Sequence, residues 1–154
     1  MIGIEQTSVL VAEYVGIESA LGDSFESWSN ASNDARVVVL SRTNAKIHRR
    51  RCETFEMVAP DLAPIDVVPS WSCLNPGKLV EMADAARGGD DVAASTAIFE
   101  VLEAATRCYS EHRRRCVPLA DAAMISVLDA TLEQNHRELD ARPLSVGCEA
   151  VVRQ

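Results

Sequence analysis

The chain has 154 residues, which suits one ordinary domain with a single hydrophobic core. Hydrophobic residues make up 47% of it and charged residues 25%, close to globular averages, so a disordered or fibrous chain is excluded. Fifteen basic and 23 acidic side chains give a formal net charge of −8, which repels a phosphate backbone, so we expect no nucleic-acid partner.

The first predicted helix spans about residues 7–28, because its apolar residues recur in steps of three and four and form one stripe. This stripe consists of Leu10, Tyr14, Ile17, Leu21, Phe25 and Trp28. Polar residues from Asn30 to Asp34 then offer side-chain oxygens that cap a second helix. Its first residues, Val37 to Leu40, favour a strand by themselves, but no turn signal follows before Pro60, so we predict a helix up to that proline.

The stretch from residue 60 to residue 76 contains four of the six prolines: Pro60, Pro64, Pro69 and Pro76. Each removes a backbone donor and fixes φ, so we expect a long ordered connection with at most short turns. In an all-helical protein, such a connection lets the long helices on either side of it run parallel. The sequence therefore predicts an all-α fold, a ferritin-like four-helix bundle with a long proline-rich crossover between helices two and three.

Three more helices are predicted after this connection, the first of them short. Pro76 suits the first turn of a short helix that continues to Ala86, and Gly88-Gly89 interrupts it. A longer helix follows over about residues 90–115, and Val117-Pro118 ends it.

The last predicted helix spans residues 119–139. Its inward stripe consists of Ile125, Leu128, Leu132, His136 and Leu139. We assign residues 1–140 to a single helical bundle domain and residues 141–154 to a C-terminal tail that is either mobile or docked on a partner.

No stretch of the chain approaches the roughly 20 apolar residues that a membrane helix needs, and the N-terminus lacks the basic-then-apolar order of a signal peptide. We therefore expect a cytoplasmic protein with no membrane partner. The five cysteines are odd in number and follow no paired framework, so we interpret them as reduced thiols. They are Cys52, Cys73, Cys108, Cys116 and Cys148.

A carboxylate-bridged di-iron bundle takes one Glu from each of two helices and a Glu-x-x-His pair from each of the other two. Four residues come near this pattern: Glu18, Glu103, Glu133 and His136. The second helix breaks it, because Ala45 stands three residues before His48, where a glutamate is required. A complete di-iron site is therefore not predicted, and iron held by those four residues is kept as an alternative.

Soft metal ligands stand at four-residue spacing at Cys108, His112 and Cys116, and again at His48 and Cys52. Two helices could thus supply four ligands to a zinc ion. Structural zinc sites usually place ligand pairs on a knuckle or turn, and cysteine is common as a small core residue, so we favour a packing role. Neither Cys52 nor Cys73 carries the sequence signature of a catalytic nucleophile.

Several polar side chains fall on the inward faces of the predicted helices: Asn44, His48, Tyr109, His112, Glu133 and His136. Burying such a group without a hydrogen-bond partner costs about 1–3 kcal/mol, so a purely structural bundle rarely collects so many. Either they line a polar cavity between the helices, or about half of them lie at the edge of a stripe and contact water.

Three segments carry a resemblance to known proteins: residues 25–28, residues 51–60, and the stretch from Tyr109 through His112 and Val117-Pro118 to Asp121. They resemble, in turn, the end of the first helix, the end of the second, and the third-to-fourth helix junction in small actinobacterial proteins of the ferritin-like superfamily. The resemblance would cover about residues 7–140. It implies a four-helix bundle with an incomplete iron ligand set, encoded by accessory genes of specialised metabolism. The family positions that it marks are Glu53, Tyr109, His112 and Asp121.

These patterns lead to three hypotheses about function. The first is a cofactor-free, metal-independent protein of bacterial biosynthesis that binds a small metabolite between its helices and transforms it by acid–base catalysis. Its candidate catalytic residues are His48, Glu53, Tyr109, His112 and His136, because imidazole titrates near physiological pH. The second is an iron oxidase or oxygenase that uses the four ligands named above. The third is a non-catalytic subunit of a homodimer or hetero-oligomer.

Overall fold

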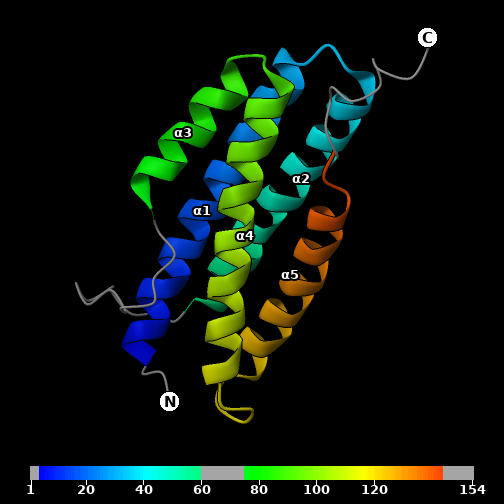
Figure 1. The fold of residues 1–154 in the computed structure, drawn as a ribbon. Coiled ribbons are helices and arrows are strands. Elements are labelled where there is room, and N and C mark those ends of the chain that lie inside the picture. The colour runs from blue at the N-terminus through cyan, green and yellow to red at the C-terminus, as the bar shows by residue number, and fades with distance from the viewer. Residues whose placement is uncertain (1–3, 60–74, 144–154) are drawn as a thin grey trace.

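The computed structural model describes residues 4–59 and 75–143, and in these residues it contains five α-helices and no β-strand (Figure 1). The helices are α1 (Ile4–Ala31), α2 (Ala35–Val58), α3 (Pro76–Arg87), α4 (Asp91–Arg115) and α5 (Ala122–Asp140). The all-α prediction is confirmed for this part of the chain. The predicted connection over residues 60–74 and the tail from residue 144 lie outside the described residues.

Capping side chains set the starts of three helices, as the sequence indicates. Asp34, Asn75 and Asp90 each accept a hydrogen bond from a backbone N–H in the first turn of the helix that follows. Between α3 and α4, Gly89 adopts a φ of 74°, a left-handed conformation that residues with a Cβ atom rarely adopt. The chain can therefore reverse direction there within a few residues.

The last helix, α5, begins three residues later than the sequence predicts. Residues 117–121 form a turn in which the amides of Ala120 and Asp121 bond to the carbonyl oxygen of Val117. The Asp121 carboxylate closes this turn by accepting the Val117 amide at 2.7 Å. A helix start at Leu119 is therefore wrong, and the Leu119 side chain is 98% exposed.

Four of the helices surround a shared interior. Each neighbouring pair is in contact, from α1 to α2, α2 to α5, α5 to α4 and α4 back to α1, while α3 packs outside against α1 and α4. In Figure 1, α1 and α5 rise from the lower end of the molecule, whereas α2 and α4 descend to it. The two long helices α2 and α4 thus run in the same direction.

The apolar part of this interior is built around six aromatic side chains with no exposed surface: Tyr14, Phe25, Trp28, Phe55, Phe99 and Tyr109. The stripe predicted for the first helix is buried along its whole length, so that prediction is confirmed. Phe25 and Phe99 meet edge to face at 6.0 Å, which ties α1 to α4 in one half of the interior. No helix in the described residues is long and apolar enough to cross a membrane.

Candidate functional site

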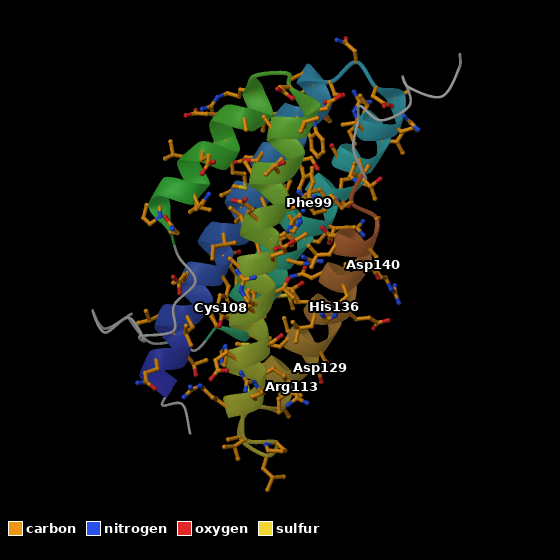
Figure 2. All side chains as sticks on the ribbon, viewed as in Figure 1. Phe99, Cys108, Arg113, Asp129, His136 and Asp140 are labelled. Atoms are coloured by element: carbon orange, nitrogen blue, oxygen red, sulfur yellow. The ribbon has the colours of Figure 1, made fainter. Side chains whose placement is uncertain are left out.

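Seven polar side chains meet in the interior between α1, α2, α4 and α5, and we call them the polar core. They are Glu18 on α1, His48 and Arg51 on α2, Thr106 and Tyr109 on α4, and Asn135 and Glu138 on α5. None is more than 8% exposed, so contacts within the protein must replace water around them. Figure 2 shows the described side chains on these helices as sticks.

His48 lies between two carboxylates that come from different helices. Its Nδ1 atom is 2.6 Å from Glu18 Oε2, and its Nε2 atom is 2.9 Å from Glu138 Oε2. Donating to both oxygens requires a proton on each ring nitrogen, which is the imidazolium form. Phe25 stacks on the face of the ring, with the two ring centres 5.3 Å apart, and so fixes its plane.

Arg51 supplies the second positive charge of the polar core. Its Nη2 atom donates to Glu138 Oε1 at 2.6 Å, and its Nη1 atom donates to the side-chain oxygen of Asn135. Nη1 also lies 3.6 Å from Glu18 Oε2. Two cations therefore face two carboxylates, and the polar core as a whole carries no net charge.

The remaining members connect these charges to α4. The hydroxyl of Tyr109 donates to Glu18 Oε1 at 2.5 Å. On the other side, Asn135 Nδ2 donates to Thr106 Oγ1 at 2.9 Å, and that hydroxyl donates to a backbone carbonyl of its own helix at 2.7 Å. Every carboxylate oxygen of Glu18 and Glu138 consequently has a donor within the protein.

The pKa values of this cluster follow from its charges and not from burial alone. Burial by itself would raise the pKa of Glu18, but the neighbouring His48, Arg51 and Tyr109 outweigh it and hold that pKa below its usual value. Burial would lower the pKa of His48, but Glu18 and Glu138 outweigh it and raise that pKa. Both shifts favour the charged forms, the carboxylate of Glu18 and the imidazolium of His48.

The local sequence explains why these residues meet. Three helices each contribute two residues three positions apart, a spacing that places both side chains on one face. The pairs are His48 with Arg51, Thr106 with Tyr109, and Asn135 with Glu138. Of these six residues, the sequence analysis found His48 and Tyr109 but missed the other four, because the spacing places each pair on one face without showing that the face is buried.

A second buried histidine lies in a different environment, the aromatic cluster of Tyr14, Phe55, Tyr109 and His112. Tyr14 packs edge to face on Tyr109 at 4.7 Å, and its hydroxyl is 3.0 Å from His112 Nδ1. Burial lowers the pKa of His112 to about 4, against a weaker opposing effect of Asp121. His112 is thus neutral at pH 7, and its Nδ1 atom shares a hydrogen bond with the Tyr14 hydroxyl.

Two of the predicted catalytic residues do not enter the interior. Glu53 and His136 are exposed. On α2, Arg51 and Phe55 point inward, so Glu53 between them points outward. On α5, Asn135 and Glu138 occupy the inward face, which turns His136 to the surface and corrects the inward stripe that we predicted.

The four candidate iron ligands are not brought together. Glu18 belongs to the polar core, whereas Glu133 is exposed and pairs with Arg137 of its own helix. Glu103 lies near the surface, 3.8 Å from Arg142. Within residues 4–59 and 75–143, no group of three or more His, Cys, Asp or Glu side chains is arranged to hold a metal ion.

The three cysteines in the described residues are free thiols. Cys108 is buried, and Cys52 donates from its sulfur to a backbone carbonyl of α1 at 3.6 Å. Burial, with the nearby Glu18 and Glu56, raises the pKa of Cys52 to about 11, and burial likewise raises the pKa of Cys116. Neither thiol is activated as a nucleophile.

Comparisons of the chain with protein families, with curated proteins and with solved structures found no match. The resemblance to ferritin-like proteins therefore stays a prediction, and function must be argued from the polar core itself.

Proposed function

We propose that this chain is a metal-independent helical-bundle protein that binds a small metabolite between its helices and transforms it by acid–base chemistry at the polar core. We also propose a ferritin-like order of helices, with the connection before α3 as the crossover. The common direction of α2 and α4 in Figure 1 supports this order. The observation that carries the functional proposal is the enclosure of His48 between Glu18 and Glu138.

Stability alone gives a poor account of this arrangement. Buried ion pairs rarely stabilise a protein more than well-packed apolar residues of the same volume would. The polar core nevertheless holds four charged groups at the centre of the molecule, where an ordinary bundle places leucine or valine. Titratable groups with shifted pKa values inside a protein occur preferentially at functional sites, which favours a chemical role.

The chemistry that suits the polar core is a coupled proton transfer. The His48 imidazolium can donate a proton to one substrate atom, and Glu18 or Glu138 can accept a proton from another. The two transfers leave the proton count unchanged, as in an isomerisation, and they require neither an oxidant nor a cofactor. Tyr109, which donates to Glu18, would hold that carboxylate in position.

The polar core does not fit a metal ion, and the reason lies in its donor atoms. Both oxygens of Glu18 and both oxygens of Glu138 accept hydrogen bonds from His48, Arg51 or Tyr109. A metal would have to displace the Arg51 guanidinium from Glu138, and the two cations would then repel it. No step of the proposed reaction therefore passes through a metal.

The test is a screen of small metabolites by NMR and thermal shift, followed by product analysis. We expect a compound that stabilises the wild type and is converted by it, but is bound without conversion by His48→Gln. Metal content is measured on the same sample. About two iron or manganese ions per chain would overturn the proposal, and so would conversion by His48→Gln at the wild-type rate.

A second candidate function is a non-catalytic subunit, and exposed apolar side chains favour it. Met57 near the end of α2 is 85% exposed, and Leu119 between α4 and α5 is 98% exposed. Helices α2 and α4 descend to the same end of the molecule in Figure 1. If that end binds a second copy, Met57→Gln combined with Leu119→Gln should convert a dimer to a monomer in sedimentation analysis, while a wild-type monomer would exclude self-association there.

A further inference from the structure

Two buried polar groups on α2 have no hydrogen-bond partner among the residues that the structure describes: the hydroxyl of Ser41 and the side-chain nitrogen of Asn44. Ser41 has no exposed surface, and Asn44 is 5% exposed. Native proteins rarely bury such groups unless water, an ion or a ligand completes their hydrogen bonds. The two groups therefore need a partner that either water or a bound molecule can supply.

The position of these groups relates them to the polar core. Asn44 lies about one helical turn before His48 and seven residues before Arg51, so it shares the face from which Arg51 reaches Asn135 and Glu138 on α5. Ser41 lies three residues further toward the start of the same face. Both groups are thus aligned with the polar core along the inward side of α2, whereas α5 ends at Asp140, two residues after the Glu138 that meets His48.

The α2–α5 interface is also the smallest of the four that enclose the interior. A small molecule that enters from this side has the fewest helix–helix contacts to displace. On α2 it would meet Asn44 about one helical turn before His48.

We propose that Ser41 and Asn44 form the polar end of a binding site for a small neutral molecule that carries a carbonyl or hydroxyl oxygen, located on the inward side of α2 one to two turns before His48. This inference rests on the proposed function and names the class of its substrate. The Asn44 nitrogen needs an acceptor, which a carbonyl or hydroxyl oxygen provides. The charges of the polar core already balance, so neither an anion nor a cation gains from the site.

Three probes of similar size and different charge test the proposal: acetamide, acetate and methylammonium. Each is titrated into 15N-labelled protein while the side-chain amide resonances of Asn44 and Asn135 are followed. We expect acetamide to shift the Asn44 resonances with saturation, and acetate and methylammonium to leave them unchanged. Asn135 is the matched control, because its amide is buried but already hydrogen-bonded to Thr106 and Arg51.

Two variants separate binding from folding. Ser41→Ala removes a hydroxyl that makes no hydrogen bond, so its melting temperature should equal that of the wild type while its affinity for acetamide falls several-fold. In Asn44→Leu, acetamide should no longer shift the resonances of other residues on α2. The inference is overturned if none of the three probes shifts the Asn44 resonances and these resonances show contact only with a slowly exchanging water.

The inference and the proposed function can fail separately. If the metabolite found by screening requires His48 but binds Asn44→Leu unchanged, the site proposed here is wrong and the acid–base function stands. If acetamide binds at Asn44 while no metabolite is converted, the binding site is supported and the catalytic proposal fails.

Discussion

His48 and His112 are both fully buried in the same interior, yet their pKa values move in opposite directions. His48 faces two carboxylates, whereas His112 faces a tyrosine hydroxyl and aromatic rings. Burial acts on both imidazoles in the same sense, against the charged form. The comparison teaches that the neighbouring charges, and not the depth of burial, decide whether a histidine inside this protein carries a proton.

The largest expected effect comes from removing one charge of the polar core. Glu138→Leu leaves Arg51 and His48 with a single carboxylate, and we expect it to lower the free energy of unfolding by about 3–5 kcal/mol. Urea titration measures this loss. Glu133→Gln, an exposed change on the same helix, serves as the control and should leave the urea midpoint unchanged; a loss below about 1 kcal/mol in Glu138→Leu would show that the charges do not depend on one another.

The next largest effect is the loss of stability in acid that His112 causes. The pKa of His112 is lowered in the folded protein, so the unfolded chain binds a proton first and stability falls from pH 6.5 to pH 4, by about 3 kcal/mol from this residue. His112→Gln should remove that loss, whereas the exposed His136→Gln should keep it. Urea midpoints at pH 7, 5.5 and 4.5 test this; equal acid sensitivity of wild type and His112→Gln would contradict the neutral state of His112.

The contributions of His48 and Glu18 to stability should change in opposite directions with pH. The pKa of His48 is raised on folding, so its contribution to stability is complete at low pH and is lost as the pH rises through the folded value. The pKa of Glu18 is lowered, so its contribution is present at neutral pH and is lost as the pH falls through the folded value. The 15N shifts of the His48 ring should report an imidazolium well above pH 6.5, and a neutral ring at pH 7 would refute the charge balance.

Replacing tyrosine by phenylalanine, once in the polar core and once in the aromatic cluster, gives a smaller difference in stability between the two regions. Tyr109→Phe removes a hydrogen bond to the charged Glu18, and we expect a loss of about 1.5–3 kcal/mol in unfolding free energy. Tyr14→Phe removes a hydrogen bond to the neutral His112, and the expected loss is about 0.5–1.5 kcal/mol. The two variants are compared by urea unfolding at pH 7, and the reverse order would mean that the two regions do not differ in charge.

The smallest effect is expected at the surface. Arg113 of α4 and Asp129 of α5, both labelled in Figure 2, make two hydrogen bonds of 2.6 and 3.2 Å, whereas Arg51 and Glu138 make one of 2.6 Å. Water screens this pair, so Arg113→Gln should leave the unfolding midpoint unchanged. A loss as large as that of Glu138→Leu would show that geometry outweighs burial in this protein.

The sequence predicted the helices well and their inward faces unevenly. Apolar spacing and capping residues located α1 and α2 to within a turn, and His48 was assigned correctly because Ala45 and Phe55 share its face. On α5 the same rule failed. It selected Leu132 and His136, one position away from the truly buried Thr131 and Asn135, because it assumes that the innermost residues are apolar.

The polar core could not be predicted in full for a related reason. Arg51 stands in the run from His48 to Arg51, where four successive polar residues give no sign of which one points inward. Glu138 and Asn135 differ from their exposed neighbours by the partners they find on α2 and α4. Such partners are set by how the helices pack, and apolar periodicity within one helix carries no information about them.

The balanced charges of the polar core also constrain how this sequence can change over time. Glu18, His48, Arg51 and Glu138 each neutralise a group on another helix, so a single replacement leaves a charge stranded in the interior. Acceptable changes must therefore come in compensating sets, for example the loss of Arg51 together with Glu138. Descendants of this chain should vary at these four positions jointly, and intermediates that differ at one of them should be rare.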